Sequence, residues 1–336
     1  MRRLQSGLAA LVFGFATSAL ALDKVPYEPT NESIAIPGAG PRQPFVPPGV
    51  DYPAIVDRGP ELSLYVDHTY ESTRDLSTFW WVRGRGSNYR LTFGGVYRSG
   101  GFQAQAEIPV QYTLLTIDTL MQQAPNDADR TKAELSLADV IGQGAYFWEL
   151  PTQDAPTYVG LNLRVRFPTH TTKFKFGLID GSTMEFGFPY YLHLAPSMLL
   201  STSYGPLFLV ANQGLLAMLA KDIDLGGVLQ KIPNLYFWES HVAAGVAATD
   251  WLSFTLELLS FAQLNRASIN DPTSGQQANI DDVKAVFLNP GLTIDLGDFR
   301  LAMAGRLDLS GRSSRDFGTL TFSGSRAFLT RLCYLF

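Results

Sequence analysis

Hydrophobic and polar residues alternate with a period of two along much of the chain after residue 60. In 157–168, for example, Leu161 and Leu163 share one side of an extended backbone, whereas Asn162 and Arg164 share the other. This alternation predicts a β-strand with one apolar face and one polar face. Strands of about ten residues cross a bilayer when they are tilted. The pattern therefore predicts an all-β chain in which each strand separates an apolar from a polar environment.

Twelve such segments occur between residue 61 and the C-terminus. We predict strands at residues 62–71, 90–98, 102–117, 137–150, 157–168, 190–204, 207–216, 237–248, 251–264, 283–296, 299–309 and 319–336. The connections at residues 99–101, 151–156, 205–206, 249–250 and 297–298 are tight, and those between them are longer and more polar. Membrane barrels have short turns at one end and long loops at the other. The chain is thus predicted to be a transmembrane, antiparallel, up-and-down β-barrel of about twelve strands.

The polar face of these strands contains the candidate functional residues. An arginine that faced lipid near the midplane would cost roughly 2–4 kcal/mol, so the strand arginines are predicted to point into the lumen. The candidate pore-lining residues are Glu107, Asn162, Arg164, Arg166, His193, Asp295, Arg300, Arg306 and Asp308. Two interpretations remain open for their charges. They form a track that sets ion preference, or they pair across the lumen and stiffen the wall.

The C-terminal segment from Phe328 to Phe336 has apolar or aromatic residues at its even positions. It resembles the last strand of bacterial outer-membrane barrels, which ends in an aromatic residue that the assembly machinery recognises. The resemblance is to this whole class of proteins. It implies outer-membrane lipids and the barrel-assembly machinery as partners, and it makes Phe336 the candidate assembly signal.

The N-terminal segment has the features of an exported protein. Arg2 and Arg3 precede a short apolar stretch, and Ala19-Leu20-Ala21 provides a cleavage site, which together predict a signal peptide at residues 1–21. Residues 22–60 contain nine prolines, which disfavour helices and central strands. We predict an extended periplasmic arm there, with insertion into the pore as a plug as the alternative. Residues 61–336 are assigned to the barrel.

One segment departs from the alternating pattern. Leucine, isoleucine and valine residues in 213–232 lie near helical spacing and are followed by Pro233. The spacing predicts a short helix in the fourth external loop. Two positions are open for it, folded over the mouth of the barrel or packed on its rim.

Motifs for catalysis or metal binding are mostly missing from the sequence. The chain contains no P-loop, no GxSxG, no HExxH and no EF-hand pattern, and Cys333 is its single cysteine. Its formal net charge is −5, which gives no indication of nucleic-acid binding. His193, Ser197 and Ser201 share one side of their strand. A hydrolase that uses His193 with either serine is one alternative, but a polar ladder along the lumen is the preferred interpretation, and we expect no cofactor and no metal.

Two stretches carry a closer resemblance. Residues 158–169 end in Pro168-Thr169, and residues 195–212 contain a Gly205-Pro206 turn followed by Ala211-Asn212. They are similar to the outer-membrane transporter family associated with phenol degradation (MetA-type), although His170 replaces a glycine of its pattern.

This resemblance covers about the central third of the chain and implies passage of small molecules, including hydrophobic or aromatic compounds. The sequence is thus interpreted as that of an outer-membrane pore or facilitator for small solutes. The alternatives are a barrel-borne hydrolase and a structural or secretion-associated barrel.

Overall fold

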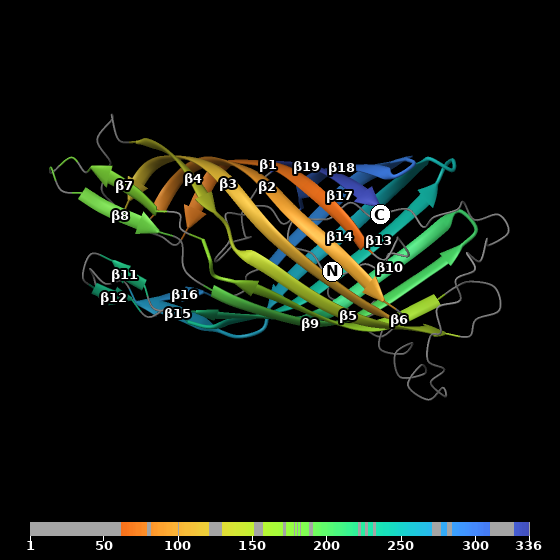
Figure 1. Ribbon diagram of the computed structural model, residues 1–336. Helices are drawn as coiled ribbons and strands as arrows, with labels where there is room; N and C mark the ends of the chain where they lie inside the picture. Colours follow the sequence, from red (N-terminus) through yellow and green to blue (C-terminus); the bar gives the residue numbers. More distant parts are fainter. Residues whose placement is uncertain are drawn as a thin grey trace.

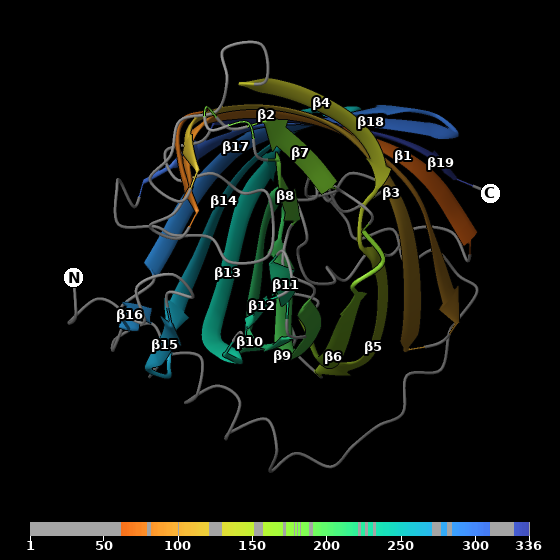
Figure 2. The ribbon, with the colours of Figure 1, turned by 90° about the vertical axis from the view of Figure 1, so that its left-hand side faces the viewer.

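The structure, a computed structural model, is a closed barrel of antiparallel strands (Figure 1). It describes residues 62–78, 82–99, 101–120, 130–150, 157–170, 173–177, 179, 181, 183–187, 191–220, 223–225, 228–230, 233–270, 277–280, 284–309 and 326–335. The sheet closes because β2 pairs with β3 as well as with β1, and Figure 2 shows the resulting ring. Within these ranges there is no helix, and hence none long and apolar enough to cross a membrane.

Twelve strand positions make up the barrel wall, as predicted. The wall strands are β1 (Leu62–Thr78), β2 (Val82–Ser99), β3 (Phe102–Leu120), β4 (Thr131–Leu137) with β5 (Val140–Leu150), β6 (Thr157–Phe167), β9 (Tyr191–Tyr204), β10 (Leu207–Ala220), β13 (Leu235–Ala247), β14 (Leu252–Gln263), β17 (Lys284–Leu296), β18 (Phe299–Asp308) and β19 (Arg326–Leu335). Each pairs with the next along the chain, and β19 pairs with β1 to close the wall. The up-and-down topology predicted from the alternating connections is confirmed.

Strands β4 and β5 share one position because the chain bulges between them. β4 pairs with the part of β3 around Thr113, and β5 pairs with the part around Gln105. Ala138 and Asp139 lie between the two strands, and both are buried. An extra residue of this kind shifts the side-chain parity of the strand. The sequence had predicted one uninterrupted strand at 137–150.

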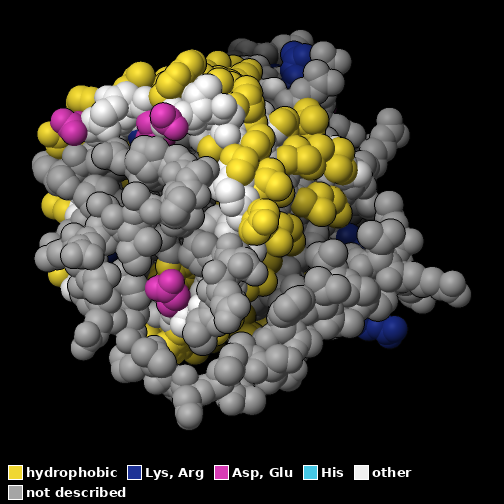
Figure 3. All heavy atoms as spheres, turned by 90° about the vertical axis from the view of Figure 1, so that its right-hand side faces the viewer, with side chains coloured by type: hydrophobic (Ala, Val, Ile, Leu, Met, Phe, Trp, Pro, Cys, Tyr) yellow, Lys and Arg dark blue, Asp and Glu magenta, His cyan; other side chains and the backbone are white. Residues whose placement is uncertain are grey.

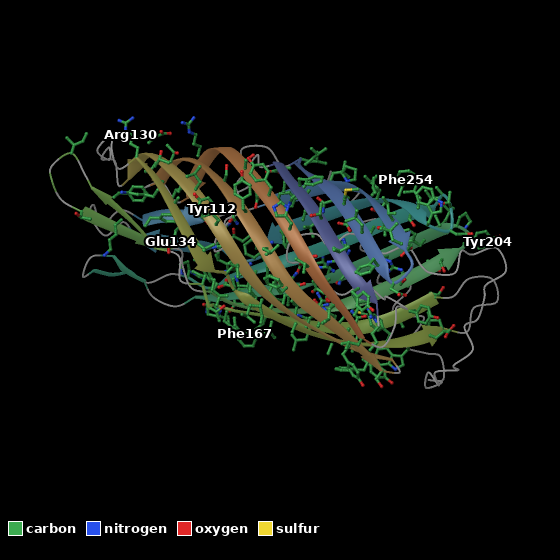
Figure 4. The ribbon with its side chains drawn as sticks, turned by 45° about the horizontal axis from the view of Figure 1, so that its top comes forward. Tyr112, Arg130, Glu134, Phe167, Tyr204 and Phe254 are labelled. Carbon is green, nitrogen blue, oxygen red and sulfur yellow. The ribbon has the colours of Figure 1, made fainter. Side chains whose placement is uncertain are left out.

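The outer surface of the wall is apolar. Leu161, Leu163 and Phe167 of β6 are exposed, while the alternate residues of the same strand are buried. Tyr112 and Phe254 are exposed on distant strands, and Figure 4 shows such side chains on the outside of the wall. Figure 3 shows hydrophobic side chains gathered on the outer wall near the tight-turn end. A continuous exposed apolar surface on a closed barrel is suited to lipid, so the strands cross the outer membrane.

The two ends of the barrel differ as predicted. Tight turns connect β9 to β10 and β17 to β18, and Gly205 takes the left-handed φ of 55° that the first turn requires. The opposite end carries three hairpins, which extend to the left in Figure 1. They are β7 (Lys173–Gly177) with β8 (Thr183–Gly187), β11 (Ile223–Leu225) with β12 (Val228–Gln230), and β15 (Ala267–Asn270) with β16 (Gln277–Ile280).

The helix predicted at 213–232 is wrong. Residues 213–220 continue strand β10, where Gln213 pairs with Met198 on one side and Ser240 on the other. The hairpin of β11 and β12 follows. The difference arises because the long neighbouring strands β9 and β13 offer backbone hydrogen bonds, which outweigh the local spacing of the apolar residues.

Several predicted loops are shorter than expected. Most of residues 72–89 belong to β1 and β2, and the start of β4 lies in the loop predicted at 118–136. The ladder is formed by the backbone, so it can continue past the membrane where polar side chains meet water. The predicted signal peptide at 1–21, the arm at 22–60 and Phe336 lie outside the described residues.

Candidate functional site

The inner face of the barrel contains every residue that was predicted to line the pore. The side chains of Asn162, Arg164, Arg166, His193, Arg300 and Arg306 are buried on this face, and those of Glu107, Asp295 and Asp308 are half-buried there. Their parity follows from the burial pattern, in which inner residues alternate with exposed, lipid-facing ones. These nine residues lie on the inner faces of β3, β6, β9, β17 and β18, and their role in lining a pore stays a prediction.

The arginines of β6 both form buried ion pairs. Nη2 of Arg164 donates to both carboxylate oxygens of Glu239, each at 3.1 Å. Glu239 lies on β13, and β9 and β10 separate it from β6, so this pair reaches past two strands. Glu239 was not among the residues predicted to line the pore. Its inward direction could have been inferred from the sequence, because it alternates with the inner residues Phe237 and His241 on β13.

Arg166 pairs with the bulge between β4 and β5. Its Nε donates to Oδ2 of Asp139 at 3.0 Å. The other oxygen, Oδ1, accepts the backbone N–H of His170 at 3.1 Å and lies 2.6 Å from Nδ1 of its ring. The hydroxyl of Thr169 donates to the carbonyl of Ala138 at 2.9 Å. The Pro-Thr-His element thus holds the bulge, and His170 supplies a ring contact to Asp139 that a glycine could not make.

A second network lies where the first and last strands meet. Arg331 of β19 donates from Nε and Nη2 to the two oxygens of Asp67 on β1. Its Nη2 is also 3.7 Å from Glu107 on β3, and its guanidinium lies 3.8 Å from the centre of the Tyr65 ring. The Tyr65 hydroxyl donates to Glu107 at 2.6 Å.

This network depends on a glycine of the intervening strand. Tyr65 reaches Glu107 across Gly94 of β2, whose register partners are these two residues. A Cβ at Gly94 would overlap the ring of Tyr65. The missing side chain therefore creates the space in which the aromatic ring lies.

Strand β18 contributes the remaining pairs. Nε of Arg300 donates to Asp295 of β17 at 2.6 Å, and the two residues are register partners. Nη1 of Arg306 is 4.0 Å from Glu71 of β1, and its guanidinium lies 4.2 Å over the ring of Phe287. All four predicted arginines consequently have a carboxylate within 4.0 Å. This favours the interpretation in which the lumen charges are paired and stiffen the wall.

The hydrolase alternative requires His193 to meet a serine, and the strand geometry opposes this. Four residues of a strand span about 13 Å, so Ser197 lies far beyond hydrogen-bond distance along β9, and Ser201 lies further still. Ser197 instead accepts a hydrogen bond from Asn162 at 3.0 Å. The ring of Tyr191 lies edge-on to His193, with the centroids 6.3 Å apart. In the described ranges, no group of His, Cys, Asp and Glu is arranged to hold a metal ion.

Several buried side chains of the inner wall have a nitrogen or oxygen atom for which the structure shows no hydrogen-bond partner. Thr255 and Glu257 of β14 and Asn289 of β17 have oxygen atoms with no hydrogen-bond partner. Arg164 and Asn212 each have an unpartnered nitrogen. Glu257 is 1% exposed, and its other oxygen accepts a hydrogen bond from Nδ2 of Asn289 at 3.1 Å.

Four of these five residues lie along the run of strands β10, β13, β14 and β17, and Arg164 lies on β6, on the other side of β9. Asn212 is the register partner of His241, whose Nε2 is 4.0 Å from Glu257. Glu257 is in turn the register partner of Asn289. We call Arg164, Asn212, Thr255, Glu257 and Asn289 the open polar wall. Among them, only Arg164 was predicted from the sequence to line the pore.

Comparison with solved structures gives matches of low sequence identity. The crystal structure of an outer-membrane channel from Pseudomonas putida F1 is 10% identical, with a TM-score of 0.55 over 87% of this chain and 100% of that one. The transport unit of the autotransporter AIDA-I from Escherichia coli is 8% identical, with a TM-score of 0.52 over 85% of this chain and 94% of that one.

No protein-family profile matches the chain, and no curated protein sequence matches it. At this level of identity the two solved structures show similarity of fold alone. The closed wall, its apolar exterior and these two matches agree, and the chain has the fold of the bacterial outer-membrane β-barrels.

Proposed function

We propose that the barrel is a narrow pore through which small solutes diffuse across the outer membrane. The observation that carries this proposal is the open polar wall. Burying a polar group without a partner costs about 1–3 kcal/mol in proteins, so an inner wall with five such residues is less stable than an apolar inner wall would be. A barrel with a purely structural role would gain stability from apolar side chains at these positions.

The size of the barrel supports a restricted passage. Barrels of eight strands fill their interiors with side chains, whereas those of sixteen or more hold wide aqueous channels. Twelve strands lie between these limits. The pair between Arg164 and Glu239 spans two intervening strands and narrows the interior further. Such a passage suits small solutes better than an extended polypeptide, which weighs against the secretion-associated alternative.

The resemblance to the transporter family associated with phenol degradation supports the same proposal, as does the fold shared with the channel from Pseudomonas putida F1. Hydrophobic or aromatic compounds are accordingly among the solutes to test. We propose in addition that residues 1–21 are a signal peptide for export and that residues 22–60 form a periplasmic arm. Phe336 is proposed as the residue that the assembly machinery recognises.

Liposome swelling with the folded full chain tests this function. Vesicles that contain the barrel should swell in isosmotic solutions of small solutes and should exclude larger ones, with a low size limit. Vesicles without protein, and vesicles with heat-unfolded protein, are the controls. Planar-bilayer recordings should show a small conductance. If correctly folded barrels give neither swelling nor conductance above the controls, the pore proposal is wrong.

A further inference from the structure

A row of aromatic side chains crosses the outer face of the barrel on β19, β1, β2 and β3. Tyr70 of β1 is the register partner of Phe328 on β19 and of Tyr89 on β2. Tyr89 is in turn the partner of Tyr112 on β3. The ring centroids of Tyr70 and Tyr89 are 4.7 Å apart, and those of Tyr89 and Tyr112 are 6.4 Å apart. Aromatic rings of membrane barrels lie at the boundary between hydrocarbon and headgroups, so this row marks the edge of the hydrocarbon layer.

The outer face changes its chemistry at this aromatic row. On the side of the tight turns, the outward residues Val66, Leu91 and Ile108 are exposed and apolar. On the side of the hairpins, the outward residues of β2 are Ser87, which is half-buried, and Arg85, which is exposed. The part of the wall beyond the aromatic row therefore meets headgroups rather than acyl chains.

A cation and two hydroxyl groups lie together in this headgroup region. Arg85 of β2 is the register partner of Thr116 on β3, which is the partner of Thr131 on β4. The hydroxyl oxygens of Thr116 and Thr131 are 3.1 Å apart. We call Arg85, Thr116 and Thr131 the basic row. Four residues of β2 separate Arg85 from Tyr89, about 13 Å along the strand and roughly 10 Å in height for a tilted barrel strand.

A second cation lies next to the basic row. The backbone N–H of Ile117 donates to the carbonyl of Arg130 at 2.9 Å, so the ladder of β3 and β4 places Arg130 directly beyond Thr131. Arg130 is exposed, and Figure 4 shows it nearer to the hairpin end than Tyr112.

The acidic residues of this region lie in two different places. Glu134 of β4 alternates with the outward-facing Thr131 and Leu135, so it faces the inside of the barrel. Asp118 of β3 is exposed and lies beyond Thr116. A carboxylate repels a phosphate, and Asp118 therefore provides a test whose sign is opposite to that of Arg85.

The order of these groups along the wall matches a phosphorylated lipid. Acyl chains contact the apolar residues, and the headgroup lies above the aromatic rings. A guanidinium binds phosphate oxygens with two parallel hydrogen bonds, and threonine hydroxyls can donate to the same group. The hairpins mark the external end of a membrane barrel, so the lipid belongs to the external leaflet. Lipid A, the phosphorylated glycolipid that anchors lipopolysaccharide, is the lipid of this leaflet with that chemistry.

We propose that the outer face of β1 to β4 is a binding site for lipid A, with a phosphate group on the basic row and Arg130 and with acyl chains below the aromatic row. This site is separate from the proposed pore function and requires no solute inside the barrel. A lipid bound there joins β2, β3 and β4 at the external end, where these strands extend past the hydrocarbon layer.

Native mass spectrometry of the folded full chain in detergent tests the site by counting bound lipid. The probe is lipid A with both phosphates, and the comparison ligands are lipid A with its phosphates removed and inorganic phosphate. Arg85→Gln and Thr116→Val remove the proposed phosphate contacts on the outer surface, and retained heat modifiability on SDS gels shows that each variant is folded. Arg266→Gln is the matched control, because Arg266 is an exposed cation just after β14.

Each variant has its own expected result. Arg85→Gln should weaken lipid A binding about fivefold, the usual effect of one basic side chain at an anionic surface. Thr116→Val should weaken it about two- to fivefold, because one hydrogen bond is lost. Asp118→Asn should strengthen it about two- to fivefold, because a repelling charge is removed. Arg266→Gln should bind as the unmodified chain does, and inorganic phosphate should leave no adduct.

Several results would overturn the inference. Equal binding of lipid A by Arg85→Gln and the unmodified chain would show that the basic row does not hold a phosphate. Equal retention of the dephosphorylated lipid would reduce the contact to its acyl chains. An equal loss in Arg266→Gln would assign the effect to positive charge anywhere on the surface. Retained inorganic phosphate would indicate a site for free anions, and dimers in place of lipid adducts would make this face a contact between two copies. Swelling assays in vesicles without lipid A test the pore separately.

Discussion

Replacement of Arg331 by methionine is the most direct test of how the barrel closes. The Arg331 side chain is 6% exposed and joins β19 to β1 through both oxygens of Asp67. It also lies 3.7 Å from Glu107 and stacks over Tyr65. Methionine fills much of the same volume but leaves the carboxylates of Asp67 and Glu107, which are only 13% and 14% exposed, without their counter-charge.

The expected loss is large for a single substitution. Removal of one partner from a buried ion pair costs about 3–5 kcal/mol in the free energy of unfolding, because the remaining charge stays buried. The second substitution Asp67→Asn should recover about 1–2 kcal/mol of this loss, because the amide that replaces the carboxylate carries no charge. Glu107 keeps its hydrogen bonds from Tyr65 and Gln105 in this double variant.

Urea unfolding of the purified barrel in lipid vesicles measures these differences, and the temperature at which the folded band disappears on SDS gels gives a second measure. Arg266→Met is the matched control, because Arg266 is an exposed cation just after β14. It should change the unfolding free energy by no more than about 0.5 kcal/mol. If Arg331→Met is as stable as this control, the network at the junction does not hold the barrel together.

The remaining predictions concern the inner wall, a packing contact and the C-terminus. The combined change of Arg164 and Arg166 to serine should shift ion preference toward cations in reversal-potential measurements, because their carboxylate partners lose their counter-charges. The same change should lower the temperature at which the barrel unfolds. An unchanged ion preference would show that these arginines do not line the conducting path. Gly94→Val should cost about 1–3 kcal/mol in urea unfolding because its side chain displaces the Tyr65 ring, whereas stability equal to the unmodified chain would contradict this packing. Deletion of Phe336 should reduce the amount of folded, heat-modifiable barrel in outer membranes, and normal insertion of the shortened chain would refute its role as an assembly signal.

The strand assignments show which kinds of prediction succeed from sequence. The side-chain period of a strand is two, so the polar and apolar residues of β6 identified both the strand and its inner face. The prediction of a helix at 213–232 was wrong because it used the spacing of apolar residues along the chain and took no account of the neighbouring strands. Residues 213–218 pair with β13, whose position was not available to a local pattern.

The candidate site was predicted only in part for a related reason. Arg164 and Arg166 were identified because a charge within an apolar strand has one tolerable direction. Their partners Glu239 and Asp139 are distant in sequence, at separations of 75 and 27 residues. Asp139 shares the parity of the buried residues Ile141 and Gln143 of β5, so its inward direction could have been read from the sequence, whereas its partners could not.

The sequence by itself determined the membrane architecture of this protein. Alternation with a period of two, tight turns at every second connection and the even strand number together lead to a barrel, because a sheet in lipid must close to satisfy its backbone. The tertiary structure decided the chemistry of the interior. Contacts between strands set the ion pairs such as Arg164–Glu239 and place the Tyr65 ring over Gly94. They also set which buried atoms of Thr255, Glu257 and Asn289 have no hydrogen-bond partner. Strand periodicity sets which face a side chain occupies, but the shear and curvature of the closed wall set which side chains it meets.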